Sequence, residues 1–391
     1  MRHDQQVEST PWTAARALAA GSAVALEPVP VPLAEALGCR LTAPLTALVA
    51  VPGVDVAAMD GYAVAGPRGP WRVVGRVLAG GACHGEELGP GQAVEIATGA
   101  PVPAGAGAVL PYERAKAAGP WVDGQVEPGR HIRRRGEDIA EGAVVLGPGS
   151  VVTPVALGLA AALGHDELPV RPRPRVAVLV TGDEVVGEGL PAPGRVRDAI
   201  GPFLPGLVAW AGGRVTGTDP LPDGPDALRA ALAALVQADV VVVCGASSKG
   251  PADHLRAVLA DLGAGVLVDG VAVRPGHPQL LARLADGPLV VGLPGNPFAA
   301  LGAAVTLLVP ILRELAGAPA GTETSALAGA VRAHPHDTRL VPVRRSGRGA
   351  VPVGHDRPGS LWGAALADAL AVVPPRWTGG PVELIGLPSG G

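Results

Sequence analysis

Residues 174–184, Pro174-Arg-Val-Ala-Val-Leu-Val-Thr-Gly-Asp-Glu184, decide the fold. Their central run is continuously apolar and rich in β-branched side chains, which is typical of a strand buried on both faces. The segments 240–244 and 289–293 have the same character, and between them the segments 225–235 and 255–262 carry apolar residues at helical spacing. This alternation predicts a mostly parallel sheet with right-handed helical crossovers.

Composition and the pattern of apolar residues divide the 391 residues into four regions, so we expect a multidomain α/β plus β protein. Residues 174–317 form the predicted α/β domain. Residues 47–140 are rich in Val and Gly with short alternating runs, which predicts an inserted β-rich domain. Residues 1–46 and 141–173 predict an extended N-terminal and linker domain, and residues 318–391 a small β-barrel-like C-terminal domain.

Composition excludes several classes of protein. The net charge of −4 argues against a nucleic-acid partner, and three cysteines without a CxxC pair argue against a disulfide scaffold or a zinc site. Residues 1–12 are polar and show no apolar region of a secretory signal. The longest uncharged apolar stretch, 298–312, falls short of the about 20 residues that span a membrane. We therefore expect a buried helix there, a cytoplasmic location and no membrane partner.

Polar residues follow each of the three predicted buried strands. Ligands of open α/β sheets bind beyond the carboxyl ends of the strands, so these segments converge on one crevice if the strands are parallel neighbours. The segments are Thr181-Gly-Asp-Glu184, Gly245-Ala-Ser-Ser-Lys-Gly250 and Pro294-Gly-Asn-Pro297. They bring Asp183, Glu184, Ser247, Ser248 and Lys249 to the predicted site.

Three features of these segments favour an anion or a metal ion, and each has a plainer alternative. Asn296 suits an N-cap and Pro297 suits the first helical position, which predicts free backbone N–H groups for a phosphate, or a simple strand-turn-helix connection. Lys249 is one of only two lysines and lies in a Gly/Ser loop that lacks P-loop spacing. This position predicts that Lys249 binds an anion, and the plainer alternative is a solvated surface lysine. Asp183 and Glu184 have two interpretations: their carboxylates are ligands of Mg²⁺, or they are acidic residues of an ordinary turn after the strand.

Two motifs lie outside the α/β region. Met59-Asp-Gly-Tyr-Ala-Val64 places an acid beside one of only two tyrosines, and Ile132-Arg-Arg-Arg-Gly-Glu-Asp-Ile139 combines three arginines with two acids. The second motif is either an ion-paired, solvated turn or a phosphate clamp. No GxSxG sequence or catalytic histidine spacing is present. The residues alone therefore predict a metal-assisted, anion-binding α/β enzyme with auxiliary β domains.

Taken together and in order, six segments resemble the molybdopterin molybdotransferase family. They are Ala58–Val64, Ile96–Pro103 with Tyr112-Glu113, Ile132–Ile139, Pro174–Glu184, Arg274–Pro278 and Gly292–Pro297. The resemblance implies a four-domain subunit that forms a homodimer, with the active site where the α/β domain faces the Met59–Val64 domain of the partner. The implied reaction inserts molybdate into adenylylated molybdopterin, with Mg²⁺ or another divalent cation, and releases AMP. The resemblance also implies contact with a molybdopterin-adenylating protein and with downstream molybdoenzyme maturation proteins.

The resemblance assigns roles to individual residues. Asp60, Asp138 and Glu184 are the acids around metal and molybdate, with Asp60 and Glu184 as metal ligands, and Thr98 is the hydroxyl of the Thr-Gly-Ala loop. The implied substrate-binding residues are Asp183, Ser247, Ser248, Lys249, Asp253, Arg274, His277, Pro294, Gly295, Asn296 and Pro297.

Three segments depart from the family pattern. The loop 245–253 differs from the family's GGVSxG type, the family's KPGKP is Arg274-Pro-Gly-His-Pro278 here, and the loop 197–201 lacks the family's asparagine. These departures motivate an alternative: a paralogue that binds and carries molybdopterin or the molybdenum cofactor without cleaving the adenylate. A nucleotide-processing enzyme that shares only the α/β domain is a weaker alternative, because that class does not need the β regions.

Overall fold

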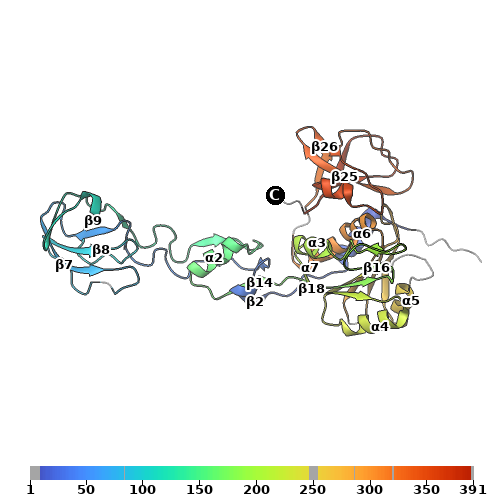
Figure 1. Ribbon diagram of the computed structural model, residues 1–391, viewed down its shortest axis with the longest axis horizontal. Coiled ribbons are helices and arrows are strands. Elements are labelled where there is room, and N and C mark those ends of the chain that lie inside the picture. The colour runs from blue at the N-terminus through green and yellow to red at the C-terminus, as the bar shows by residue number, and fades with distance from the viewer. Residues whose placement is uncertain (1–8, 83, 246–253, 286, 319–320, 389–391) are drawn as a thin grey trace, which may run out of the picture. The chain divides into compact units, whose positions relative to one another are not determined.

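The chain folds into two compact units. The computed structural model describes residues 9–82, 84–245, 254–285, 287–318 and 321–388 (Figure 1). The α/β unit contains residues 1–29, 38–40 and 171–391, and the β unit contains residues 30–37 and 41–170. The boundaries of the four regions expected from the sequence stay a prediction.

A six-stranded sheet forms the centre of the α/β unit. Its strands are, in spatial order, β18 (Arg214–Leu221), β15 (Arg175–Thr181), β19 (Val240–Cys244), β23 (Leu289–Leu293), β22 (Leu280–Arg283) and β20 (Gly265–Asp269). The first four strands pair in parallel, whereas β22 is antiparallel to both of its neighbours. The three segments predicted as buried strands are therefore confirmed as the parallel neighbours β15, β19 and β23.

Helices cover both faces of this sheet because successive strand residues point to opposite faces. Val240 and Val242 pack against one helical layer, and Val241 and Val243 pack against the other. The first layer consists of α1 (Trp12–Gly21), α3 (Leu204–Trp210), α6 (Pro297–Ala303), the π-helical turn η3 (Ala304–Leu308) and α7 (Val309–Leu315). The second layer consists of α4 (Pro225–Ala234) and α5 (Leu255–Asp261), on the opposite side in Figure 1.

The continuous helical stretch Pro297–Leu315 is the core of the first layer. It is long and apolar enough to cross a membrane, with a mean hydropathy of 1.7, but 89% of it is buried inside the unit. The expectation of a buried helix in this region is confirmed.

A second sheet of the α/β unit contains the C-terminal strands. Its strands are β1 (Thr10–Pro11), β21 (Val271–Arg274), β25 (Thr338–Ser346), β27 (Ala369–Val373), β28 (Pro381–Gly386) and β24 (Glu323–Ala326), with β26 (Gly349–Pro352) paired to β25. Leu327, which directly follows β24, bridges to Ala350 of β26, and the Ala328 N–H donates to the Ala350 carbonyl at 2.8 Å. The strands β26, β25, β27, β28 and β24 therefore close on themselves, which agrees with the expected small barrel-like domain, while β21 and β1 extend the sheet beyond β25. The remaining elements are β16 (Val185–Val186), β17 (Val196–Arg197) and α8 (Trp362–Leu366).

The β unit is built on a six-stranded sheet. Its strands are β10 (Lys116–Ala118), β11 (Trp121–Asp123), β7 (Trp71–Val77), β8 (Gln92–Ile96), β6 (Gly61–Val64) and β9 (Ala108–Pro111). The smaller pieces are η1 (Leu33–Glu35), β4 (Leu45–Thr46), β5 (Val56–Ala57), η2 (Tyr112–Arg114), β12 (Ile132–Arg133), β13 (Val144–Leu146) and α2 (Pro154–Ala162). The strands β2 (Val29–Pro32), β3 (Arg40–Leu41) and β14 (Glu167–Arg171) contain three of the four points where the chain passes between the units. The predicted multidomain α/β plus β fold class is confirmed.

Strand β6 depends on the glycine at its first position. It pairs with β8 on one side and β9 on the other, and Gly61 lies opposite both Ile96 and Pro111. A Cβ atom on Gly61 would lie 2.1 Å from the carbonyl oxygen of Leu110. Because that oxygen is backbone, it cannot move away without breaking the pairing of β6 and β9.

We expect Gly61→Ala to destabilise the β unit. Forcing a methyl group into this space costs about 1–3 kcal/mol or more of unfolding free energy. Gly158→Ala is the matched control, since Gly158 is helical with nothing within 4 Å of its Cβ position, and alanine there stabilises by about 0.5–1 kcal/mol. Urea unfolding of both variants measures the difference, and equal stability of Gly61→Ala and wild type contradicts the argument.

Candidate functional site

The three strand ends of the α/β unit meet as expected from the sequence. Thr181 Oγ1 donates a hydrogen bond to the Cys244 carbonyl at 2.9 Å, and the Gly245 N–H donates to the Leu293 carbonyl at 3.0 Å. The Gly245 Cα lies 3.7 Å from the Cβ position of Gly295. The segments after β15, β19 and β23 therefore start side by side. Ser247, Ser248, Lys249 and Asp253 of the middle segment lie outside the described residues.

The segment after β15 carries two exposed acids, Asp183 and Glu184. Asp183 and Asp223 exchange hydrogen bonds of 3.2 Å, each backbone N–H donating to the other carboxylate. The Glu184 carboxylate lies over Gly182, where a Cβ atom would be 2.9 Å from its Oε2. Asp183 lines a cavity of about 460 Å³ together with Asp198. Asp183 is thus held by its turn, whereas the Glu184 carboxylate faces solvent.

Asp198 organises the loop in which the family's asparagine is absent. Its Oδ1 accepts hydrogen bonds of 2.9 Å from the N–H groups of both Ile200 and Gly201. A carboxylate oxygen accepts these bonds as well as an amide oxygen does. The departure from the family pattern at this loop therefore leaves the turn in place.

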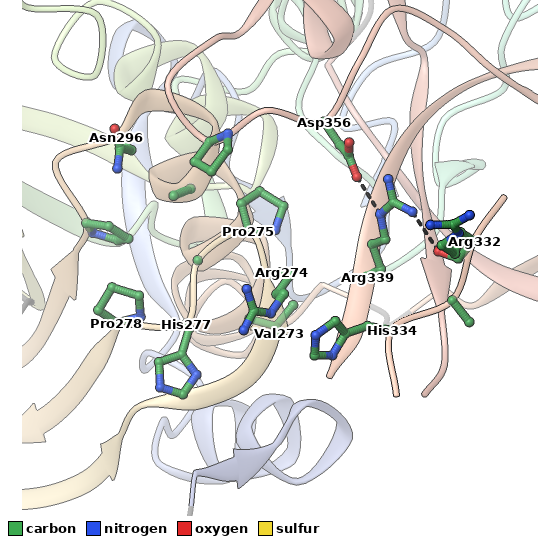
Figure 2. Close-up of a pocket in the computed structure, with 15 residues that line it drawn as sticks. Val273, Arg274, Pro275, His277, Pro278, Asn296, Arg332, His334, Arg339 and Asp356 are labelled. Carbon is green, nitrogen blue, oxygen red and sulfur yellow. Dashed lines mark hydrogen bonds and ion pairs between the residues drawn. The ribbon is translucent and has the colours of Figure 1, made fainter. Parts of the chain in front are cut away.

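A cavity of about 520 Å³ lies between the loop after β21 and the C-terminal residues (Figure 2). Four of the residues predicted from the sequence line it: Arg274, His277, Pro294 and Asn296. Its other polar lining residues are Arg332, His334, Arg339 and Asp356, which the sequence analysis did not select. The cavity thus gathers three arginines and two histidines.

Carboxylates compensate two of these arginines. Arg274 Nε lies 2.6 Å from Asp337 Oδ2, and Arg339 Nε lies 2.6 Å from Asp356 Oδ2. The second pair is visible in Figure 2, where Arg339 also donates to the Arg332 carbonyl at 2.6 Å. In the part of the chain that the structure describes, no carboxylate lies within ion-pair distance of the Arg332 guanidinium. Arg332 is therefore the arginine of this cavity with its charge uncompensated.

Strand pairing explains why the sequence analysis missed the C-terminal residues. Val273 pairs with Thr338 and Arg274 with Arg339, in parallel. This ladder joins segments more than 60 residues apart, which periodicity within either segment does not reveal. The local signal was the density of basic residues in Arg332-Ala-His-Pro-His-Asp337.

The helix after Pro294-Gly-Asn-Pro297 corrects one expectation. Asn296 is the N-cap residue and Pro297 the first helical residue, as predicted, but the Asn296 side chain makes no capping hydrogen bond. The N–H groups of Phe298 and Ala299 donate to the Pro358 carbonyl at 2.8 and 3.3 Å. The prediction that these groups are free for a phosphate is wrong, because a C-terminal loop satisfies them. Pro294 and Asn296 still line the cavity.

Two glycines allow the Arg274–Pro278 loop to pack closely against this helix. A Cβ atom on Gly276 would lie 2.9 Å from the Ala299 carbonyl oxygen, and one on Gly302 would lie 2.8 Å from the Pro275 carbonyl oxygen. Both contacts are with backbone, so larger residues would push the loop away from the helix. This approach fixes the position of Arg274 and His277 at the cavity.

In the β unit, the structure brings Asp60 and Thr98 together. Asp60 Oδ1 accepts hydrogen bonds from the Thr98 N–H at 2.7 Å and from Thr98 Oγ1 at 3.0 Å. The pairing of Gly61 with Ile96 places the two residues at the same end of adjacent strands. Both side chains are exposed. The structure thus presents a fixed carboxylate at this end of the sheet.

The arginine-rich segment is an ion-paired turn. Arg134 pairs with Asp55 at 2.6 Å, Arg135 pairs with Glu141 at 2.6 Å, and Arg133 pairs with Asp138. The Arg135 N–H and the Arg134 guanidinium hold the pKa of Asp55 below its usual value. Each arginine already has a carboxylate partner, so the phosphate-clamp interpretation is not supported. Asp138 lies within this turn and pairs with Arg133, whereas the hydrogen bonds of Asp60 are to Thr98.

The described residues contain no group of three His, Cys, Asp or Glu side chains able to enclose a metal ion. The two predicted metal ligands are in different units: Asp60 belongs to the β unit and Glu184 to the α/β unit.

Three family models match the chain in sequence order. The MoeA N-terminal region (domains I and II) matches residues 10–164, the probable molybdopterin binding domain matches residues 177–314, and the MoeA C-terminal region (domain IV) matches residues 324–383.

Similar proteins agree with these matches. Molybdopterin molybdenumtransferase 2 of Mycobacterium tuberculosis is 39% identical over 315 residues, which cover 75% of this chain and 77% of that protein. The molybdopterin molybdenumtransferase of Synechococcus elongatus is 36% identical over 298 residues, covering 72% and 74%. The crystal structure of a molybdopterin biosynthesis MoeA protein from Pyrococcus horikoshii is similar with a TM-score of 0.72 and 27% identity, covering 96% of this chain and 98% of that chain.

We expect opposite effects from two substitutions around the basic cavity. Asp337→Asn removes a negative charge and should strengthen the binding of inorganic phosphate, whereas Arg332→Gln should weaken it. Each change should be about threefold or more at low salt, because a nearby unit charge contributes on the order of 1 kcal/mol, and 0.5 M NaCl should shrink both.

Isothermal titration calorimetry with phosphate measures both effects. Arg348→Gln is the matched control, since Arg348 is an exposed arginine that does not line the cavity. Equal phosphate affinity in all three variants contradicts the assignment of the cavity as an anion site.

Proposed function

Because this chain belongs to the molybdopterin molybdenumtransferases, transferases of molybdenum cofactor biosynthesis, we propose that it inserts molybdate into adenylylated molybdopterin and releases AMP. The observation that carries this proposal is the match of three family regions in order over the chain, with Arg274, His277 and Pro294 at one basic cavity.

The charge of the cavity suits the anionic substrates of this reaction. Molybdate is a dianion, and negative charge grows on the leaving phosphate as the bond to the adenylate breaks. The Arg332 guanidinium can bind an oxyanion without first losing an ion pair within the described residues. Arg274 and Arg339 add charge-assisted donors while Asp337 and Asp356 hold them in position.

The acids of the site have distinct tasks in this proposal. Thr98 holds the Asp60 carboxylate through two hydrogen bonds to one oxygen, so the carboxylate is oriented before substrate arrives. Glu184 has an exposed carboxylate beside the converging strand ends. Asp138 in its ion-paired turn is the third acid that the family resemblance assigns.

The donor chemistry of these acids fits a divalent cation such as Mg²⁺. Mg²⁺ usually takes one or two carboxylates and completes its shell with water and substrate phosphates. We propose Glu184 and Asp60 as the residues that hold it. When bound, the cation neutralises charge on the phosphate groups of the substrate.

We also propose that the protein is a cytoplasmic homodimer. In this proposal it receives its substrate from a molybdopterin-adenylating protein and passes the product to maturation proteins of molybdoenzymes. The resemblance to the family supports this assembly, and a homodimer is the commonest form of soluble oligomer.

The release of AMP tests the function. Purified protein is mixed with adenylylated molybdopterin and Mg²⁺, molybdate is added, and AMP is measured by chromatography. We expect release that depends on molybdate, and a loss of roughly 100-fold or more in folded Glu184→Ala, because a group that stabilises developing charge contributes on that scale. Glu188→Ala, an exposed acid of the same segment, is the control. Tight binding of the substrate without AMP release would establish the carrier alternative instead.

Mixed dimers test the proposal that two subunits share one reaction. Asp60→Asn and Glu184→Gln chains with different affinity tags are co-expressed, and the mixed dimers are purified. If Asp60 and Glu184 act from different subunits, one of the two sites is intact, and we expect about half of the wild-type AMP release. Each variant alone should be inactive. Inactive mixed dimers would place both residues on the same subunit.

A further inference from the structure

Strand register in the β unit assembles a row of side chains that the proposed function does not use. Arg76 on β7 pairs with Glu95 on β8, and Glu95 pairs with Tyr62 on β6. Directly paired residues project from the same face of a sheet, so the three side chains are neighbours. Tyr112, which follows β9, adds its ring: the ring centroids of Tyr62 and Tyr112 are 5.3 Å apart at an interplanar angle of 90°. The only two tyrosines of the chain thus lie in contact.

Tyr112 is fixed and yet exposed. Its hydroxyl donates a hydrogen bond of 2.7 Å to Glu95 Oε1, while Arg76 donates to Glu95 Oε2 at 2.7 Å. The hydroxyl is therefore anchored to a carboxylate that an arginine holds in turn. Even so, Tyr112 remains 43% exposed. An anchored aromatic side chain loses little conformational entropy when a ligand covers it, which favours binding.

The hydrogen bond between Tyr112 and Glu95 moves the two pKa values in opposite directions. Burial, together with the hydrogen bond to the Glu95 carboxylate, raises the pKa of Tyr112 to about 12. The same hydrogen bond and the Arg76 guanidinium hold the pKa of Glu95 below its usual value.

The backbone of Tyr112 contacts the backbone of Asp60, the acid to which we assign a role in the reaction. The Tyr112 N–H donates to the Asp60 carbonyl at 3.3 Å, and Asp60 accepts both hydrogen bonds from Thr98. Gly61 pairs with both Ile96 and Pro111, so Asp60, Thr98 and Tyr112 all lie at one end of the same three strands. The exposed Tyr112 ring and the fixed Asp60 carboxylate thus belong to the same end of the sheet.

We propose that Tyr112 is a substrate-positioning residue whose ring stacks on a planar, fused nitrogen heterocycle of the substrate. This inference rests on the proposed function, whose substrate carries two such rings, a pterin and an adenine. Stacking suits both, because each presents a π face, and the fixed ring would hold the heterocycle while the phosphate end reaches the charged groups.

Steady-state kinetics of Tyr112→Leu tests the proposal. We expect KM for adenylylated molybdopterin to rise about tenfold with kcat within about twofold of wild type, since stacking on one aromatic side chain contributes on this scale. Tyr112→Phe keeps the ring but loses the hydroxyl that anchors it to Glu95, so its KM should rise less than that of Tyr112→Leu. Trp121→Leu is the matched control, because Trp121 is 47% exposed on β11 of the same sheet and lies outside the row. If Tyr112→Leu does not fold, the same measurement uses Tyr112→Gln, whose polar side chain suits an exposed position.

Calorimetry with AMP and, separately, with pterin-6-carboxylate identifies the stacked ring. Weaker binding of AMP to Tyr112→Leu assigns the adenine, and weaker binding of the pterin assigns the pterin. An active wild-type enzyme together with an unchanged KM in folded Tyr112→Leu overturns this inference alone. A wild-type protein that releases no AMP contradicts the proposed function itself, which separates the two failures.

Discussion

Two backbone pairings, Val273 with Thr338 and Arg274 with Arg339, join the end of β21 to β25 of the C-terminal region. The basic cavity depends on this short ladder, because it puts arginines from both segments on adjacent strands. Pairing such distant segments has an entropic cost that only the surrounding core can offset. That core exists here: Leu340 of β25 belongs to the same buried cluster as Phe298 and Leu308 of the helical layer.

The arrangement of charge follows from this constraint. Three arginines gathered at one cavity repel each other, and Asp337 and Asp356 offset two of them. Both ion pairs are partly exposed, so they contribute little to stability, about 0–1 kcal/mol each. Their effect is on geometry: they orient Arg274 and Arg339 while Arg332 keeps its charge for a ligand. The Pro358 carbonyl also accepts the hydrogen bonds of the N–H groups at the start of α6. The C-terminal residues are therefore part of the site.

Local patterns in the sequence predicted those elements whose character is repeated along the segment. Continuous apolar runs predicted β15, β19 and β23, and helical spacing predicted α4 and α5. The cap residues Asn296 and Pro297 marked the start of α6 correctly. The same residues predicted that the N–H groups at the start of α6 are free, and this was wrong because the Pro358 carbonyl accepts their hydrogen bonds. A cap sequence contains no information about a loop some 60 residues further along. For Arg133 to Arg135 the sequence left two interpretations open, and only the positions of Asp55 and Glu141 decided between them.

The sequence by itself determined the fold class, the segments that form the strands followed by polar loops, and the family, because each is encoded in neighbouring residues and their spacing. Tertiary structure alone decided which charges meet. Arg274 with Asp337, Asp60 with Thr98 and Tyr112 with Glu95 are partners far apart in the chain, brought together by strand register. The physical reason is that hydrophobic periodicity is a local property, whereas an ion pair or hydrogen bond depends on distance in space, which the packed core sets.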